Sequence, residues 1–231
     1  MKFYFLTLFP EMIHAYFKES LMEKGLKEGI IDYEVLNIRD FSQDKHKRVD
    51  DYPFGGGAGM VMTPQPIIDA LKSIPEREKY PVIYLSSGGS TYKQKTSSDL
   101  SAYPGLILIC GRYEGIDQRI IDAYVDYELS VGDYILTGGE LAALIICDSV
   151  CRHLKGYLGN PESLEDESFN ENLLEYPQYT RPREFEGMQV PEILLSGNHG
   201  QIKEWRLKQS IEKTVQIRPD LYKKYLSKNK H

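Results

Sequence analysis

The chain has 231 residues, of which 41% are hydrophobic, 11% aromatic and 27% charged, and its formal net charge is −6. This composition excludes a disordered chain, and the length fits one large domain or one domain with a small appendage, since domains run to ~100–200 residues. No apolar run approaches the ~20 residues that a membrane-spanning helix needs.

Strand-like and helix-like patterns alternate over the first 154 residues. In chain order, we expect a strand over residues 4–9, a helix over 10–21, a strand over 33–38, a helix over 63–71, strands over 81–85 and 106–110, a helix over 117–124, a strand over 127–129 and a helix over 140–154. Pro10 suits a first helical turn, and Thr63 before Pro64 predicts a capped helix start. The alternation is typical of an α/β fold with a mostly parallel sheet and helices on both faces.

The character of the chain changes after Leu154. Residues 160–176 hold six acidic residues and no Lys or Arg, and four prolines punctuate residues 156–195. A long irregular segment of this kind is typical of a linker, a lid or a binding loop.

Residues 201–231 have the opposite charge, with nine Lys or Arg against three Asp or Glu. Within them, Ile202, Trp205, Ile211 and Val215 lie on one predicted helix face. We expect a small helical C-terminal domain with a basic surface. On charge alone, that surface is either a solvated helix face or a site for an anionic partner.

Three glycine-bearing loops follow predicted strands, at residues 86–90, 111–115 and 131–140. One such loop is only a turn, but the carboxyl ends of strands in an α/β sheet form the edge where such sheets bind ligands. We therefore favour a small-molecule pocket over plain turns. Arg112, Glu114 and Asp133 are its candidate polar groups, although each of them alone fits a surface ion pair.

Four glycines also lie within residues 55–59. Glycine admits positive φ and lets backbone N–H groups approach an anion closely. The run is not a P-loop, because Met60 follows instead of Lys-Ser/Thr, and no strand precedes it as in a dinucleotide-binding motif. By itself, this pattern favours a flexible loop over a ligand-binding loop.

The remaining reactive side chains exclude several classes of site. The five histidines have no metal-ligand spacing, and no Gly-x-Ser-x-Gly motif occurs, so we expect neither a structural metal site nor a hydrolase. Cys110, Cys147 and Cys151 are odd in number and lack metal-ligand spacing. Together with the absence of a signal-peptide pattern, this predicts reduced thiols in a soluble cytoplasmic protein with no membrane partner.

The motifs form an ordered set that spans nearly the whole chain. They comprise His46 with residues 49–51, then residues 54–60, 84–86, 110–117, 131–134, 138–140, 179–182, 194–199 and 205–210. In this set the chain resembles the bacterial tRNA (guanine-N1)-methyltransferases, a family of the SPOUT class of knotted methyltransferases.

The resemblance implies a deep trefoil knot in a SPOUT domain over residues 1–155, a flexible acidic linker or active-site loop over 156–176, and a helical tRNA-binding domain over 177–231. It also implies an obligate homodimer with its active site at the subunit interface. The implied reaction moves a methyl group from S-adenosylmethionine to N1 of the tRNA guanosine at position 37, immediately 3′ of the anticodon. The sequence leaves open whether the reaction also needs Mg²⁺.

The resemblance also implies site residues. The methyl-donor contacts would be Tyr84, Leu85, Ser86, Gly111, Tyr113, Glu114, Gly115, Val131, Gly132, Tyr134, Leu136, Gly138 and Gly139. The substrate contacts would be His46, Asp50, Gly55, Gly56, Gly57, Gly59, Ser196, Asn198 and His199.

Arg152 matches the family's active-site arginine. The family's catalytic aspartate commonly precedes a Ser-Phe pair, but here Glu167 precedes Ser168 and Phe169, with Asp166 one position earlier. Both carboxylates are therefore candidate general bases. Glu167 is favoured because it holds the family position directly before the Ser-Phe pair. The chemistry needs such a base for the guanine N1 proton and a cation near O6.

Two other functions remain open on the sequence. One is a nucleotide-binding α/β enzyme of another class, and the other is a noncatalytic RNA-binding protein.

A further departure from the family is Ser87, which stands where a proline is common and leaves the rigidity of that loop open.

Overall fold

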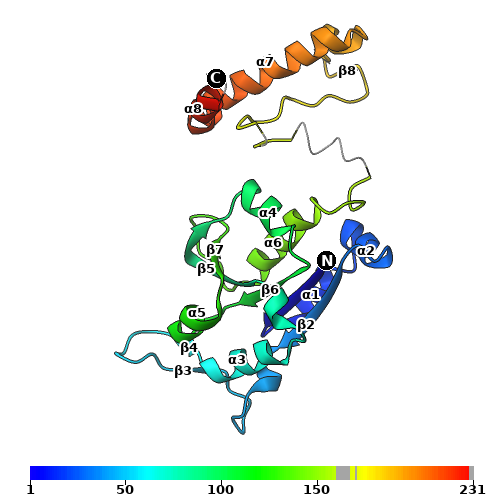
Figure 1. The fold of residues 1–231 in the computed structure, drawn as a ribbon. Helices are drawn as coiled ribbons and strands as arrows, with labels where there is room; N and C mark the ends of the chain where they lie inside the picture. Colours follow the sequence, from blue (N-terminus) through cyan, green and yellow to red (C-terminus); the bar gives the residue numbers. More distant parts are fainter. Residues whose placement is uncertain (160–166, 170, 229–231) are drawn as a thin grey trace. The chain divides into compact units, whose positions relative to one another are not determined.

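The computed structural model describes residues 1–159, 167–169 and 171–228, and the chain divides into two compact units, Met1–Gly159 and Asn160–His231 (Figure 1). Asp166, one of the two candidate bases, lies outside the described residues. No helix among the described residues is long and apolar enough to cross a membrane.

The first unit is built on a five-stranded sheet in the order β2-β1-β6-β5-β7, in which every pairing is parallel. The strands are β1 (Lys2–Thr7), β2 (Asp32–Asn37), β5 (Val82–Thr91), β6 (Gly105–Cys110) and β7 (Tyr127–Ser130). All five were expected from the sequence, so the predicted α/β class with a mostly parallel sheet is confirmed.

Helices cover both faces of this sheet, as the strand pattern predicted. Successive residues of a strand point to opposite faces, so Phe3 and Phe5 of β1 belong to one buried cluster and Tyr4 and Leu6 to another. The first cluster includes residues of α1 (Pro10–Tyr16), α2 (Ser20–Lys27), α4 (Gln94–Leu100) and α6 (Glu140–Cys151). The second includes residues of α3 (Pro64–Ser73) and α5 (Gln118–Tyr124).

The predicted helix over residues 10–21 is wrong in its length, because two helices replace it. α1 ends at Tyr16, and α2 begins at Ser20, whose φ of 54° is incompatible with a continuous right-handed helix. Between them, the buried Phe17 ring stacks on Tyr33 of β2 with a centroid distance of 3.9 Å. This contact between elements leaves no periodic signal in the sequence.

The predicted loop over residues 86–90 lies inside β5. Leu129 of β7 is the register partner of both Leu85 and Ser90, so the residues between them bulge out of the ladder. A Cβ on Gly89 would lie 2.6 Å from the Glu128 carbonyl, which explains why glycine stands there.

Several element ends also differ from expectation. The first strand covers residues 2–7 instead of 4–9, and α6 ends at Cys151 instead of residue 154. Thr63 holds the cap position of α3, but its hydroxyl donates to the Val49 carbonyl at 3.2 Å and makes no cap bond. Several elements were not predicted: α4, the short antiparallel pair β3 (Asp50–Asp51) and β4 (Val61–Met62), and the 3₁₀ turns at Ile38–Phe41 and Arg77–Lys79.

The described part of the second unit contains the hairpin β8 (Glu184–Phe185) and β9 (Met188–Gln189), a 3₁₀ turn (Glu192–Leu195), and the helices α7 (His199–Ile217) and α8 (Pro219–Lys228). Thr214 of α7 is fully buried, while Val215 of the predicted apolar face is exposed. The reason is that the Thr214 hydroxyl accepts the Leu174 N–H at 2.8 Å and donates to the Ser210 carbonyl, so its polar group is satisfied in the interior.

Candidate active site

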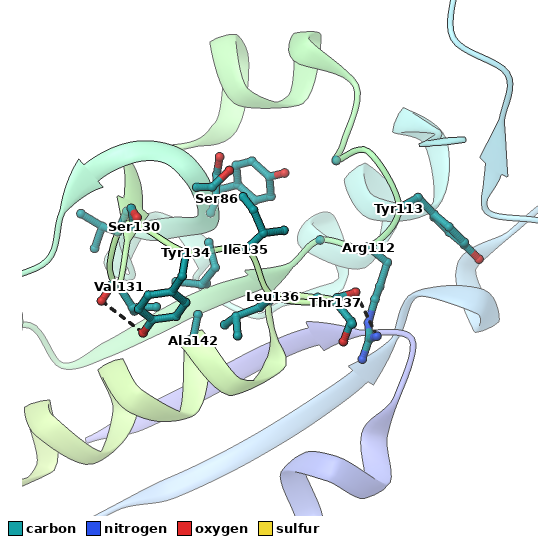
Figure 2. Close-up of a pocket in the computed structure, with 18 of the residues that line it drawn as sticks. Ser86, Arg112, Tyr113, Ser130, Val131, Tyr134, Ile135, Leu136, Thr137 and Ala142 are labelled. Atoms are coloured by element: carbon teal, nitrogen blue, oxygen red, sulfur yellow. Dashed lines mark hydrogen bonds between the residues drawn. The ribbon is translucent and has the colours of Figure 1, made fainter. Parts of the chain in front are cut away.

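A cavity of about 260 Å³ lies at the carboxyl ends of β5, β6 and β7 (Figure 2). Its walls come from residues 84–87 of β5, from the end of β7, from the segments that follow β6 and β7, and from the start of α6. All thirteen residues predicted to contact a methyl donor, from Tyr84 to Gly139, line this one cavity. The structure therefore brings the whole predicted set together, and its role in binding stays a prediction.

Glycines shape the cavity around the Tyr84 ring. A Cβ on Gly111 would lie 2.9 Å from the ring, and a Cβ on Gly115 would lie 3.1 Å from its hydroxyl oxygen. Tyr84 is buried, and burial raises the pKa of its hydroxyl. These two positions need glycine because a side chain would compete with the tyrosine for space.

The backbone of the third loop is packed directly on the end of β6. The Gly139 N–H donates to the Gly111 carbonyl at 2.9 Å, and a Cβ on Gly139 would lie 2.8 Å from the Cys110 Cα. Cys110 is fully buried beneath this contact, and burial raises the pKa of its thiol well above the usual range. An inert, protonated thiol at this position fits a packing role.

A buried polar cluster closes one end of the cavity. Glu140, at the start of α6, is 1% exposed, and its Oε1 accepts the Thr7 hydroxyl at 2.7 Å and Arg112 Nε at 3.2 Å. Arg112 Nη2 lies 2.9 Å from Glu140 Oε2, and Nη1 donates to the Thr137 carbonyl at 3.1 Å (Figure 2). The guanidinium also lies over the Phe9 ring, 4.2 Å from its centroid. Arg112 thus pairs with a buried carboxylate. The expectation of a surface ion pair, which rested on its residue type alone, is therefore wrong.

The glycine run of residues 55–59 is joined to this cavity at one end. The run lies between β3 and β4, and Gly55, Gly56, Gly57 and Gly59 all have positive φ. A Cβ on Gly59 would overlap the carboxylate of Glu114, a cavity-lining residue. The run therefore ends against the candidate site, although it is far from it in sequence.

Backbone hydrogen bonds fix this junction. The Met62 N–H donates to the Gly115 carbonyl at 2.9 Å, and the Glu114 N–H donates to the Met60 carbonyl at 3.0 Å. The Asp117 N–H donates to the Met62 carbonyl at 3.1 Å. The segment that follows the glycines and the loop after β6 each donate backbone hydrogen bonds to the other. These bonds hold the two segments together.

The other predicted substrate residues are spread over both units. Asp50 lies in β3, and the exposed His46 belongs to a turn in which its N–H donates to Asp44 Oδ1 at 2.8 Å. Ser196, Asn198 and His199 surround the start of α7 in the second unit. Asn198 is the cap there, since its Oδ1 accepts the Gln201 N–H at 3.2 Å.

The candidate catalytic groups belong to different units. Arg152 is the half-buried cap residue at the end of α6 in the first unit. Glu167 lies in the second unit, where it lines a cavity of about 640 Å³ together with His199 and Lys203.

Five residues that line this cavity were not named individually in the sequence analysis: Leu129, Ser130, Ile135, Thr137 and Ala142. Leu129 and Ser130 end β7, so the rule that ligands bind beyond strand ends could have found them. Ile135 is strongly exposed between two predicted contacts, and a large apolar side chain on the surface was the available signal.

Comparisons with known proteins agree with one another. A family model described as tRNA (Guanine-1)-methyltransferase TrmD matches residues 1–224. A protein named tRNA (guanine-N(1)-)-methyltransferase from Clostridioides difficile (strain 630) is 56% identical, over 97% of this chain and 98% of its own length. A protein of the same name from Borrelia duttonii (strain Ly) is 57% identical, over 98% of this chain and 94% of its own length. Another from Clostridium botulinum (strain Eklund 17B / Type B) is 56% identical, over 96% of this chain and 93% of its own length.

Proposed function

The chain belongs to the tRNA (guanine-1)-methyltransferase family, and from this membership we propose that it transfers a methyl group from S-adenosylmethionine to N1 of the tRNA guanosine at position 37. The observation that carries the proposal is the cavity beyond β5, β6 and β7. It gathers all thirteen residues that the family resemblance assigned to the methyl donor.

The cavity suits a nucleoside-containing donor. Its glycines let a ligand approach the backbone at Gly111, Gly115 and Gly139, and backbone N–H and C=O groups recognise a purine edge and a ribose without a metal. Tyr84 and Leu85 supply apolar surface, and Glu114 supplies a carboxylate. When bound there, the donor supplies a methyl group that its sulfonium already activates.

The protein's own part in the reaction is to hold the guanine and to move one proton. Guanine N1 carries a proton and is a poor nucleophile, so a base must take that proton as the N1–methyl bond forms. We assign this role to Glu167, with Asp166 as the alternative. Arg152 would stabilise the negative charge that develops on O6.

A homodimer follows from the same proposal, and an apolar surface supports it. Five large apolar side chains are exposed at α1 and α6. They are Phe9, directly before α1, Met12 and Tyr16 of α1, and Leu141 and Ile145 of α6. The two helices touch, with the Tyr16 hydroxyl donating to Asp148 Oδ1 at 3.0 Å. A surface of this kind on a folded unit is typical of an interface, and Ala142 of α6 lines the donor cavity, so the cavity would adjoin the partner subunit.

The finer architecture belongs to the proposal as well. A trefoil knot is supported by the close packing of Gly139 on Cys110 and Gly111, which presses the third loop against the second. The division into a donor domain over residues 1–155, an acidic linker over 156–176 and a tRNA-binding domain over 177–231 is supported by the basic residues beyond position 200. A tRNA substrate suits the expected cytoplasmic location.

Two measurements separate this function from its competitors. Calorimetry should detect binding of S-adenosylmethionine but not of NAD or ATP, and the reverse would indicate a nucleotide-binding enzyme of another class. Labelled methyl should then move from the donor to unmodified tRNA. Donor binding or RNA binding without any transfer would contradict the proposed activity.

A further inference from the structure

The second unit contains a cavity of its own, whose chemistry differs from that of the donor cavity. It has a volume of about 450 Å³ and lies between residues 176–183, the turn at Glu192–Leu195 and α7. Three aromatic residues line it, Tyr176, Tyr179 and Trp205, and so do three arginines, Arg181, Arg183 and Arg206. Among the described residues that line it, none is Asp or Glu.

The aromatic rings leave stacking surface free. Tyr179 and Trp205 have ring centroids 6.4 Å apart and planes tilted by 54°, so neither ring covers the face of the other. Tyr179 is 48% exposed, whereas Ile202, Trp205 and Arg206 are half-buried and come from one face of α7, three and four residues apart. A rigid helix face thus presents an indole beside a solvent-accessible phenol ring.

The three arginines differ in which partners their guanidinium groups have within the described part of the protein. Arg183 is paired with Glu192 at 3.1 Å, whereas Arg181 is exposed and makes no ion pair within the described part of the chain. The Arg206 guanidinium lies 4.6 Å from the centroid of the Tyr176 ring, and its buried Nε has no hydrogen-bond acceptor among the described groups. A buried N–H without an acceptor is costly, so a ligand oxygen there would be stabilising.

We propose that this aromatic–arginine pocket binds one unpaired nucleotide of the RNA substrate, with its base against Tyr179 and Trp205 and its phosphate on Arg181. The chemistry favours this ligand because a flat base needs an aromatic face and a phosphodiester needs an unpaired guanidinium. A base inside a duplex is unable to enter such a pocket, so the nucleotide comes from a single-stranded loop. The proposal rests on the proposed function, in which tRNA is the substrate.

Trp205 makes the pocket directly observable, because it is the single tryptophan of the chain. We would titrate the full-length protein with an unmodified anticodon stem–loop RNA and follow tryptophan emission. Stacking of a base beside the indole should quench the emission in a saturable way. A parallel titration with guanosine monophosphate shows whether the pocket prefers a free nucleotide.

Three variants separate stacking from nonspecific effects. Tyr179→Ala should weaken RNA binding by about five- to 150-fold, the range for the loss of one stacked base. Tyr179→Phe keeps the ring and should bind like the unaltered protein. Phe185→Ala is the matched control, because Phe185 is an exposed aromatic residue of β8 in the same unit that does not line the pocket.

Arg181→Gln tests the phosphate contact separately. The slope of log affinity against log salt should fall by about 0.7, the value for one phosphate of a single strand. Emission unchanged by RNA, equal affinities for Tyr179→Ala and Phe185→Ala, or tighter binding of guanosine monophosphate than of RNA would each overturn the pocket assignment. Methyl transfer by the unaltered protein is measured independently, so its failure would instead contradict the proposed function.

Discussion

The guanidinium of Arg112 lies 2.9 Å from the buried carboxylate of Glu140, and this pair joins the loop after β6 to the first turn of α6. Both residues also hold neighbours, since Glu140 accepts the Thr7 hydroxyl and Arg112 donates to the Thr137 carbonyl. The pair therefore links the ends of β1 and β6 to the loop that lines the candidate donor cavity.

Glu140→Gln should lower the free energy of unfolding by about 3 kcal/mol. This is the low end of the range for breaking a buried ion pair, because Arg112 is 16% exposed and keeps some solvent contact. Urea denaturation measures the change. Asp99→Asn is the control, because it removes the exposed Lys95–Asp99 pair and should cost less than about 1 kcal/mol. Equal effects of the two substitutions would contradict the structural role of Glu140.

The end of β6 and the loops after β6 and β7 could be predicted because their signals are local. Residues 106–110 are apolar and bounded by glycine, and Gly111, Gly115 and Gly139 stand where backbone or ring contacts exclude a side chain. These loops were expected at one edge of the sheet because the carboxyl ends of parallel strands lie at the same edge.

Features that depend on contacts between distant elements were not predictable. The break at Ser20 accompanies the packing of Phe17 on Tyr33, and the burial of Glu140 depends on Arg112, 28 residues away. Nothing in the local pattern around Glu140 indicates a buried carboxylate, because glutamate is common in the first turn of exposed helices. The role of Glu114 against Gly59 was hidden for the same reason.

Gly59→Ala should weaken binding of S-adenosylmethionine by roughly tenfold, equivalent to one lost polar contact of about 1.4 kcal/mol. The new methyl group would displace the Glu114 carboxylate from its place at the cavity. Gly56→Ala isolates this effect, because Gly56 has a similar φ (79° against 84°) but nothing within 4 Å of the added carbon. Calorimetry on both variants makes the comparison, and equal donor affinities would contradict the role of Glu114.

Leu141→Asp should shift the protein from dimer to monomer. Leu141 is 51% exposed on α6, and a carboxylate there would be desolvated in an apolar interface. Sedimentation velocity at several concentrations measures the association. Leu226→Asp in α8 replaces a leucine that is 41% exposed and should leave the dimer intact. A monomeric unaltered protein would contradict the proposed interface, as would an unchanged Leu141→Asp dimer.

Glu167→Gln should lower the single-turnover rate of methyl transfer by ~10²–10⁴-fold, the usual contribution of a general base. Binding of the donor and of tRNA should change little, because the amide keeps the shape of the side chain. Asp166→Asn is the neighbouring control and should be mild. The opposite ranking would identify Asp166 as the base, and normal rates in both variants would contradict a carboxylate mechanism.

Primer extension on a reacted transcript tests most directly whether the protein methylates N1 of the guanosine at position 37. A methyl group on N1 blocks the Watson–Crick edge, so reverse transcription should stop immediately 3′ of that guanosine after incubation with S-adenosylmethionine. The stop and the incorporated label should both disappear when the guanosine is replaced by adenosine. A stop at another position, or undiminished incorporation into the adenosine transcript, would contradict the account.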